Sequence, residues 1–574
     1  MSSTTVDGST STPNSEGEPQ ANEGHPRGLF VLFGTEAWER FSYYGMRALL
    51  VLYLTKNFKF SRADALEMYG IYTGLVYLTP LLGGYLADKI LGRRKAVLIG
   101  GILMALGQIA LTQPSLLHFA LGLLIAGNGF FKPNISTMVG GLYREGDARR
   151  DGAFTIFYMG INLGALYSPL VCGTIADRPD RVLVTGFLAA GAGMALGLWQ
   201  FWFGQKHLGT TGLPPRAAIE EENTETGPYR SSTITSAAST LRAKDYIDVL
   251  IWSSVTVGLV WGALLLWNVV GPTWSALPVV VKLGVLFAAL GVVFFQLYRG
   301  NTKEQVQEVS VIIILCAFNI FFWMGFEQAG GTMTLFADEQ TQRNLGPVAL
   351  GAIGLVVCAA AYNFRLSTRD QASGKALWWV LFLMLGVMGL GIIGLGVQSA
   401  ITGETFEVKA SHFQAVNPII IVALAPTFSN LWQKLDSGRF RTSTPTKMAI
   451  GMILLGLGFA VLFVGQRLAE ATDGKANVAW LGGVYLIHTI GELCLSPIGL
   501  SMVTKLAPPR VSSLAMGLWL GSSAAANYLA GILESKLEAV HVPIFAFLIV
   551  SSIGPALLLL AMTPLLKKWM HGKA

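Results

Sequence analysis

The sequence has few charged residues and few cysteines for its length. Asp, Glu, Lys and Arg together make up 13% of its 574 residues, while 52% of the residues are hydrophobic. A water-soluble domain carries about a quarter charged residues, so this composition argues against a soluble class and indicates a membrane protein. The cysteines lie inside apolar segments without CxxC spacing, which predicts reduced packing residues rather than a disulfide framework. They are Cys172, Cys316, Cys358 and Cys494.

The sequence also lacks the signatures of several function classes. It contains no cluster of His, Cys and carboxylates with metal-ligand spacing, no phosphate-binding loop of the P-loop kind, and no nucleophile with a recognisable base. We therefore expect no enzyme activity, no ATP-driven pumping and no bound metal or cofactor. The net charge of +7 comes from basic residues that fall between apolar segments, so it indicates membrane orientation rather than nucleic-acid binding. No obligate protein partner is inferred.

Apolar stretches of about 20 residues, the length that spans a bilayer, recur from residue 27 to residue 566. Residues 1–27 are polar and lack the basic start of a secretory signal, so we expect a disordered cytoplasmic tail. Residues 28–205 predict an N-terminal six-helix bundle. Its helices are expected at 28–56, 66–90, 95–113, 115–141, 151–174 and 181–205.

A second half follows a polar stretch. Residues 206–245 predict a cytoplasmic linker, and residues 246–298 predict an inserted helical hairpin. A C-terminal six-helix bundle is expected over 308–566, before a basic cytoplasmic tail over 567–574. Its core helices are expected at 308–337, 412–434, 446–468, 478–505, 511–534 and 541–566.

A second insertion is predicted at 349–397, where two apolar runs are separated by basic residues. We interpret it as another hairpin. The run from Leu350 to Phe364 is short for a span, so a re-entrant segment is the alternative.

Lysines and arginines gather in the short loops on the side of the N-terminal tail, such as 88–95 and 143–151. This distribution predicts a multi-pass protein of the cell inner membrane with both termini in the cytoplasm. Two halves of six helices joined by a cytoplasmic linker match the architecture of major facilitator transporters. The predicted fold is therefore an all-α polytopic membrane protein with the major facilitator fold, two six-helix bundles plus inserted helices.

Ionised side chains inside the first predicted helix are the strongest functional signal. Each costs roughly 2.5 to 3.5 kcal/mol on membrane insertion scales, so each is expected to face a partner or a wet cavity. Positions 36, 40, 43 and 47 share one helix face. A solvated amphipathic segment is the alternative interpretation. The ionised residues of this helix are Glu36, Glu39, Arg40 and Arg47.

Depth along the helices, at 1.5 Å per residue, indicates which isolated charges can meet. Arg47 and Glu327 are both expected about 28 Å from the cytoplasmic entries of their helices, and Lys132 and Glu492 both about 22 to 24 Å from the outer entries. Each pair is predicted to be a gating ion pair that joins the two bundles on one side of a central cavity. Separation of such a pair can let a buried glutamate take up a proton. Static pairs that specify packing are the alternative.

Residues 36–47, Glu-Ala-Trp-Glu-Arg-Phe-Ser-Tyr-Tyr-Gly-Met-Arg, resemble the signature of the proton-coupled oligopeptide transporter family, bacterial type, of the major facilitator superfamily. The resemblance continues in 131–136, in 326–328 and in 491–497, and it covers nearly all core helices. The loop 83–94 resembles the loop motif of the wider superfamily. Ala165, where the family often has serine, and the long connection over 349–397 depart from the family pattern.

The resemblance implies a symporter that imports di- and tripeptides by alternating access, with protons as the coupling ion. Glu36, Glu39 and Arg40 would serve proton coupling. Arg47 and Lys132 would hold the peptide carboxylate, and Glu492 would bind the amino group. Glu327 is grouped with the substrate-binding residues as the partner of Arg47. Six further residues are expected to line the pocket, although ordinary packing is nearly as plausible for each: Tyr43, Tyr44, Tyr77, Asn162, Asn417 and Trp519.

Two further interpretations concern His488 and the substrate. His488 lies one turn before Glu492, and an ordinary core or boundary histidine is favoured there over a proton relay. The alternative functions are a related carrier of nitrate or peptide-like drugs and a membrane peptide sensor that does not transport. The complete glutamate cluster disfavours the first, and the lack of a large soluble output domain disfavours the second.

Overall fold

The structure is a computed structural model that describes residues 24–144, 147, 149–176, 183–213, 241, 243–276, 278–369, 375–437, 442–472, 474–495 and 498–573. Most of the predicted tail over 1–27 and of the predicted linker over 206–245 lies outside these residues. Within them, 11 helices are long and apolar enough to cross a membrane. The chain is therefore a multi-pass membrane protein, and the predicted all-α class is confirmed.

Among the described residues, the first half consists of six long helical segments, of which α2 and α3 together form one. Ser61 caps α2 by accepting a hydrogen bond from the Asp64 amide, and Pro80 at the first position of α3 explains why the predicted helix over 66–90 is divided. Inside this half, α1 packs against α6 and α7, and α4 packs against α5. The elements are α1 (Arg27–Lys56), α2 (Arg62–Leu78), α3 (Pro80–Leu86), η1 (Ala87–Leu91), α4 (Arg93–Ala110), η2 (Pro114–Leu116), α5 (Leu117–Gly141), α6 (Arg149–Ala176), α7 (Val184–Gly204) and η3 (Gln205–His207).

The second half begins with an interrupted helix. Its α-helical part ends at Phe326, and a 3-10 turn then carries Glu327 before the chain resumes as helix at Thr332. This break places Glu327 at a helix end, inside the protein. The elements are α11 (Lys303–Phe326), η4 (Glu327–Gly330), α12 (Thr332–Glu339), η5 (Ala410–Ala415), α15 (Val416–Ser437), α16 (Thr444–Ala471), α17 (Val478–Leu495), α18 (Ile498–Leu506), η6 (Pro509–Val511), α19 (Ser512–Glu538) and α20 (Ile544–Trp569).

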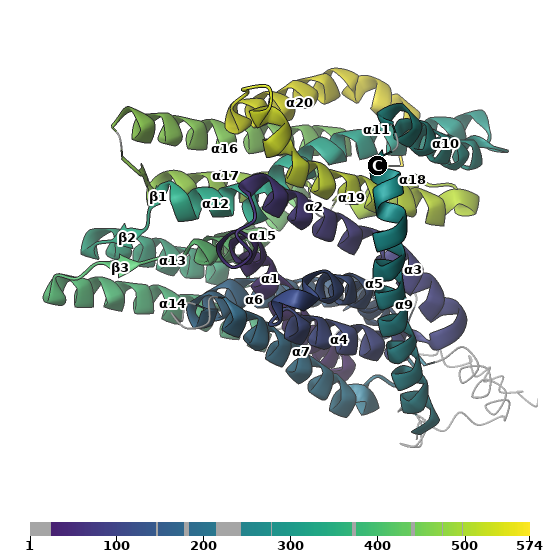
Figure 1. Cartoon of the computed structure of the whole chain (residues 1–574), viewed down its shortest axis with the longest axis horizontal. Helices are drawn as coiled ribbons and strands as arrows, with labels where there is room; N and C mark the ends of the chain where they lie inside the picture. Colours follow the sequence, from purple (N-terminus) through teal and green to yellow (C-terminus); the bar gives the residue numbers. More distant parts are fainter. Residues whose placement is uncertain are drawn as a thin grey trace, which may run out of the picture.

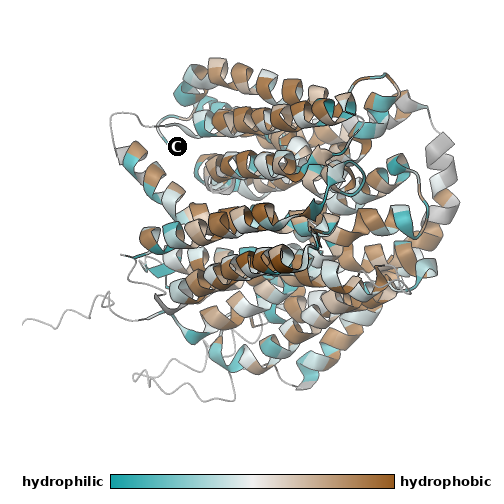
Figure 2. Cartoon of the chain, turned by 90° about the vertical axis from the view of Figure 1, so that its left-hand side faces the viewer, coloured by the Kyte–Doolittle hydropathy of each residue, from teal (hydrophilic) through white to brown (hydrophobic). Residues whose placement is uncertain are grey.

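The two halves lie side by side in Figure 1, the first in purple to blue and the second mostly in green to yellow. They meet where α2 packs against α19 and where α6 packs against α15. Figure 2 shows hydrophobic residues along the helices and hydrophilic residues mainly toward the helix ends. Exposed large apolar side chains, such as Leu82 at 68% and Val387 at 68%, fit a lipid environment.

The first inserted hairpin consists of α9 (Ala243–Ala276) and α10 (Val279–Tyr298). In Figure 1, α9 runs along one edge of the molecule. Lys95 at the start of α4 holds α9 through ion pairs of 2.8 Å to Asp245 and 2.7 Å to Asp248. This contact attaches the hairpin to the first half.

Two helices occupy the region of the second predicted insertion, α13 (Pro347–Ser367) and α14 (Lys375–Thr402). The run that begins at Leu350 extends at both ends to give a helix of 21 residues, long enough to cross a bilayer rather than to re-enter it. Gly354 and Gly389 allow the two helices to approach closely. The hairpin packs on α15, and its apolar cluster includes Met159 of α6.

The opposite side of the molecule from the start of α1 carries short strands and ion pairs. β1 (Thr341–Gln342) pairs in parallel with β4 (Ala476–Asn477), with Thr341 opposite Ala476. β2 (Asn344–Leu345) pairs in antiparallel with β3 (Phe406–Glu407), with Asn344 opposite Glu407. Here the end of α1 meets α12 through Lys56 and Asp338, whose ion-pairing atoms are 2.7 Å apart. The two halves are thus in contact on this side.

Candidate functional site

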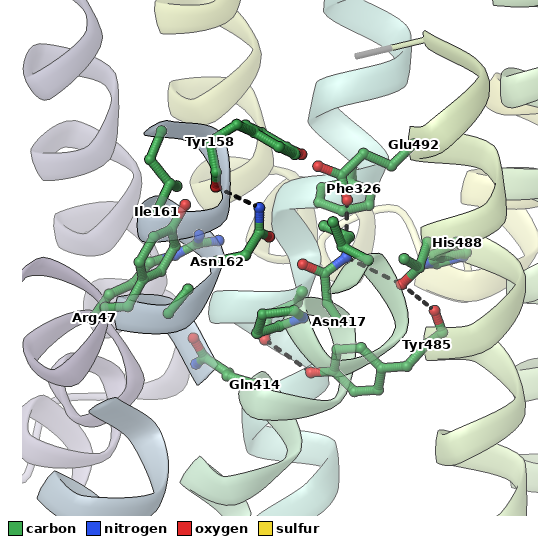
Figure 3. Close-up of a pocket in the computed structure, with 16 residues that line it drawn as sticks. Arg47, Tyr158, Ile161, Asn162, Phe326, Gln414, Asn417, Tyr485, His488 and Glu492 are labelled. Atoms are coloured by element: carbon green, nitrogen blue, oxygen red, sulfur yellow. Dashed lines mark hydrogen bonds between the residues drawn. The ribbon is translucent and has the colours of Figure 1, made fainter. Parts of the chain in front are cut away.

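A cavity of about 200 Å³ lies between the two halves. Its walls come from α1 and α6 of the first half and from α11, η4, η5, α15 and α17 of the second half (Figure 3). Five residues predicted from the sequence line it: Tyr44, Arg47, Asn162, Asn417 and Glu492. The other lining residues are Tyr158, Ile161, Ala165, Phe326, Ala329, Gln414, Pro418, Ile421, Tyr485, His488 and Thr489.

Arg47 joins the two halves at one side of this cavity. Its Nη2 atom is 2.5 Å from Glu327 Oε2, and its Nε atom donates a hydrogen bond of 2.6 Å to the Tyr69 hydroxyl. The guanidinium also lies over the Tyr44 ring, 5.8 Å from its centre. Glu327 is 4% exposed and Arg47 12%, so the pair is shielded from water. The structure therefore brings together the first pair predicted by helix depth.

Three buried charges form a second cluster on α1. Arg40 forms ion pairs with Glu39 and with Glu36, the latter at 3.2 Å between Nε and Oε1. Asn128 of α5 donates a hydrogen bond of 3.3 Å to Glu39. Among the described residues, Glu36 Oε2 and Arg40 Nη2 have no hydrogen-bond partner. Lys132 of α5 also interacts electrostatically with both carboxylates, so two cations lie near two carboxylates.

The predicted ion pair between Lys132 and Glu492 is absent from this conformation. The Lys132 ammonium lies over the Tyr77 ring, 5.0 Å from its centre, and Glu492 accepts a hydrogen bond of 2.8 Å from Asn417. The position of a residue along its helix determines its height in the membrane but not the lateral distance between helices of different bundles. Lys132 lies on α5, which packs within the first half, whereas Glu492 lies on α17, which packs against α15 and α16.

The remaining predicted residues fall into two groups. Asn162 donates to the carbonyl of Tyr158 in its own helix at 3.0 Å and presents its other amide atom beside the cavity (Figure 3). Tyr43 and Trp519 are buried, at 5% and 6% exposure, and are not among the residues that line the cavity. Tyr43 instead lies under the Arg40 guanidinium, 5.1 Å from it.

Several site residues were not predicted from the sequence. Tyr69 binds Arg47, and Gln414, Tyr485 and Thr489 line the cavity. Tyr69 and Tyr485 carry no charge and lie in apolar helices, so nothing in the sequence distinguishes them from packing residues. Gln414 is an amide three residues before Asn417 in an apolar segment, and this was the one weak indication that it lines the cavity.

The arrangement suits a solute with both charges. Arg47 provides a cation at one wall, and Glu492 provides an anion at the opposite wall, on α17. Between them lie amides and hydroxyls of both halves, including Asn162, Gln414 and Tyr485. Such a cavity can bind a small zwitterion and can select it by the distance between its positive and negative groups.

Comparison with known proteins gives consistent matches over most of the chain. The model of the POT family matches residues 94–255 and 377–548. The uncharacterized transporter YclF of Bacillus subtilis (strain 168) is 32% identical over 562 residues, covering 96% of both chains. A di-/tripeptide transporter of Lactococcus lactis subsp. lactis (strain IL1403) is 32% identical over 560 residues, covering 95% of this chain and 96% of that one.

Solved structures give the same result. The crystal structure of peptide transporter POT in complex with sulfate has a TM-score of 0.69 and 31% identity, covering 96% of this chain and 97% of that one. The structure of a POT family transporter in complex with 5-aminolevulinic acid has a TM-score of 0.70 and 28% identity, covering 95% and 98%. These likenesses confirm the predicted major facilitator-type fold.

Proposed function

Because this chain belongs to the POT family of transporters, we propose that it imports di- and tripeptides together with protons. Like its relatives, it is a membrane transporter and not an enzyme. The single observation that carries the substrate proposal is the cavity between the halves, with Arg47 on one wall and Glu492 on another. A peptide of any side-chain composition presents one cation and one anion at a nearly constant separation, and this cavity offers the complementary charges.

The carboxylate end of the substrate would compete with Glu327 for Arg47. Arg47 suits a carboxylate because a guanidinium donates two parallel hydrogen bonds. When the substrate carboxylate accepts these bonds, Glu327 loses its partner, and the tie between α1 and η4 weakens. Lys132 would add a second cation for the carboxylate, and Glu492 would accept hydrogen bonds from the ammonium group.

Proton coupling is proposed for the cluster of Glu36, Glu39 and Arg40. The cluster carries two carboxylates and one guanidinium, and the Lys132 ammonium of α5 interacts electrostatically with both carboxylates. When Lys132 moves away to pair with Glu492, the cluster is left with one negative charge in excess while both carboxylates are ionised. An uncompensated charge inside a membrane protein is costly. Uptake of one proton neutralises the cluster. This would lower the free-energy cost of keeping the cluster inside the membrane during the conformational change.

Alternating access would use the two ion pairs in turn. The Arg47–Glu327 pair supports closure on the side away from the start of α1. Formation of the Lys132–Glu492 pair would close the other side after the first pair opens. We propose that the chain lies in the cell inner membrane with both termini in the cytoplasm, as the basic loops favour.

The experiment that tests the substrate is counterflow in liposomes containing the purified protein. Radiolabelled dialanine outside should exchange for unlabelled dialanine inside. Nitrate and acetylated dialanine-amide, which has no terminal charges, should fail to compete. Exchange of nitrate without dialanine would replace the substrate assignment, and dialanine binding without any exchange would favour a sensor.

A further inference from the structure

His488 is held in one orientation by α16. Its Nε2 atom is 3.0 Å from the backbone oxygen of Leu455, and its ring packs edge-on against Phe459 with 4.5 Å between ring centres. Gly458 provides the room, because a Cβ atom at that position would lie 2.5 Å from His488 Nε2. His488 is 3% exposed. Contacts from three residues within about one helical turn of α16 therefore fix the imidazole beside the cavity that it lines.

The contact with Leu455 determines which ring nitrogen carries hydrogen. A backbone carbonyl oxygen can only accept a hydrogen bond, so Nε2 is the donor. In a neutral imidazole the other nitrogen, Nδ1, is then an acceptor. His488 thus presents an uncharged acceptor one helical turn from Glu492 (Figure 3).

The polar groups around Glu492 are already committed in a way that favours a donor as the ligand. Asn417 uses its amide hydrogens on Glu492 at 2.8 Å and on the Thr489 hydroxyl oxygen at 3.0 Å. The Thr489 hydroxyl in turn donates to the backbone oxygen of Tyr485 at 2.7 Å. Because these donors are used within the protein, this wall offers acceptors to the cavity. It matches a ligand group that brings several hydrogens and a positive charge.

We propose that His488 is a second acceptor for the ammonium group of the substrate, beside Glu492, and thereby determines specificity for primary amines. The inference rests on the proposed peptide transport and deepens it. An ammonium group has three N–H donors, and a single carboxylate cannot accept all three in good geometry. Glu492 supplies the opposite charge, while His488 Nδ1 accepts a hydrogen that Glu492 leaves free.

Two ligands separate this role from charge recognition. Dialanine has three ammonium hydrogens, whereas dialanine with two N-methyl groups keeps the positive charge but has only one. In His488→Gln the side-chain amide can still reach the Leu455 oxygen, but no acceptor remains at the position of Nδ1. The variant should bind dialanine about 10-fold more weakly, the loss of one hydrogen bond to a charged group. Its affinity for the dimethylated peptide should change by less than about twofold, because the single N–H of that ligand is used by Glu492 and none is left for His488.

A second variant keeps the test decisive. His488→Asn places an amide near the position of Nδ1 and should keep dialanine affinity within about threefold of wild type, since the acceptor is restored. Affinities are measured by competition for labelled dialanine. Equal losses for both ligands in His488→Gln, or no loss for either, would overturn the proposed role and leave histidine as a packing residue. Failure of the wild-type protein to bind dialanine is a different result, because it overturns the proposed function itself.

Discussion

Arg47 of α1 and Glu327 of η4 form a buried ion pair, with Nη2 and Oε2 2.5 Å apart, that joins the two halves of the molecule. The other oppositely charged pair predicted to join the halves, Lys132 and Glu492, is not formed in the same conformation. An ion pair therefore joins the halves on one side of the cavity, while the pair predicted for the other side is not formed. This asymmetry is what a carrier that opens to one side at a time requires.

The first prediction concerns the equilibrium between conformations. Loss of one partner of a buried ion pair costs about 3 to 5 kcal/mol, enough to invert a two-state population. Glu327→Gln should therefore shift the protein from the conformation closed near Lys56 toward the opposite one. Spin labels at the exposed positions Asn57 and Lys475 should report a larger fraction of long distances. The matched control is Arg467→Gln, which removes an exposed pair within one helix and should leave the distances unchanged.

The second prediction concerns the amino end of the substrate. Glu492→Gln removes the anion but keeps a side chain of the same size that can still contact Asn417. Dialanine affinity should fall at least about 10-fold, since a charged hydrogen bond is lost. Acetylated dialanine, which lacks the ammonium group, should bind wild type and variant with similarly weak affinity. Glu67→Gln, at an exposed position of α2, serves as the control. Unchanged dialanine binding in Glu492→Gln would remove this residue from the site.

The third prediction concerns stability at two neighbouring glycines. A Cβ atom at Gly83 of α3 would collide with the backbone of Gly129 in α5, whereas at Gly84 it would find only ordinary contact, 3.6 Å from Pro133 Cβ. Gly83→Ala should therefore destabilise the protein by about 1 to 3 kcal/mol through overpacking. Gly84→Ala should be neutral or slightly stabilising, since alanine favours helix. Thermal unfolding in detergent compares the two, and equal midpoints would contradict the close contact between α3 and α5.

The sequence predicted which segments form helices because an apolar run of bilayer length must pair its backbone polar groups within itself, and a helix does this. It also predicted the Arg47–Glu327 contact, since depth along two helices is fixed by residue number when both begin on the same side. It did not predict that Lys132 and Glu492 are apart, because their contact depends on the conformation and on the lateral separation of helices. The depth of a residue along its helix gives neither the conformation nor the lateral separation.

The neutral residues of the site were the least predictable. The sequence marks a charged side chain in an apolar helix, but it gives no such contrast for Tyr69, which binds Arg47, or for Tyr485. The orientation of His488 depends on the space at Gly458 and on a carbonyl of another helix. These are tertiary contacts without a local pattern.

The fourth prediction concerns pH at the segment that precedes α1. His25 lies 2.9 Å from the Tyr143 hydroxyl and packs edge-on against its ring. Burial, and then the charge of Arg149, lowers the pKa of His25 below its ordinary value of 6.5, although Asp147 opposes the shift. The packed state therefore favours neutral imidazole. As the pH falls below about 6.5, a released His25 binds a proton that the packed one does not, so packing loses stability.

Hydrogen exchange at the start of α1 measures this loss. The Leu29 amide, which donates to the Pro26 oxygen at 3.0 Å, should exchange faster at pH 5 than at pH 8 once the intrinsic pH dependence is removed. His25→Gln cannot titrate and should show no such corrected difference. A corrected rate independent of pH in the wild-type protein would show that His25 does not stabilise this segment.

The final prediction concerns the coupling of peptide transport to protons. Glu36 shares Arg40 with Glu39 and has one carboxylate oxygen without a hydrogen-bond partner among the described residues. Glu36→Gln keeps the shape of the side chain but cannot bind and release the proton. It should retain exchange of dialanine across the membrane and lose accumulation driven by a gradient. Glu470→Gln, at an exposed end of α16, is the matched control.

The most direct measurement of the central claim is dialanine uptake into proteoliposomes with an imposed inward proton gradient. The proposed symport predicts that the wild-type protein and Glu470→Gln accumulate dialanine above its outside concentration. Glu36→Gln should only equilibrate it. Accumulation by Glu36→Gln equal to that of the wild type, or dialanine uptake by the wild type that does not respond to the gradient, would contradict proton coupling through this cluster.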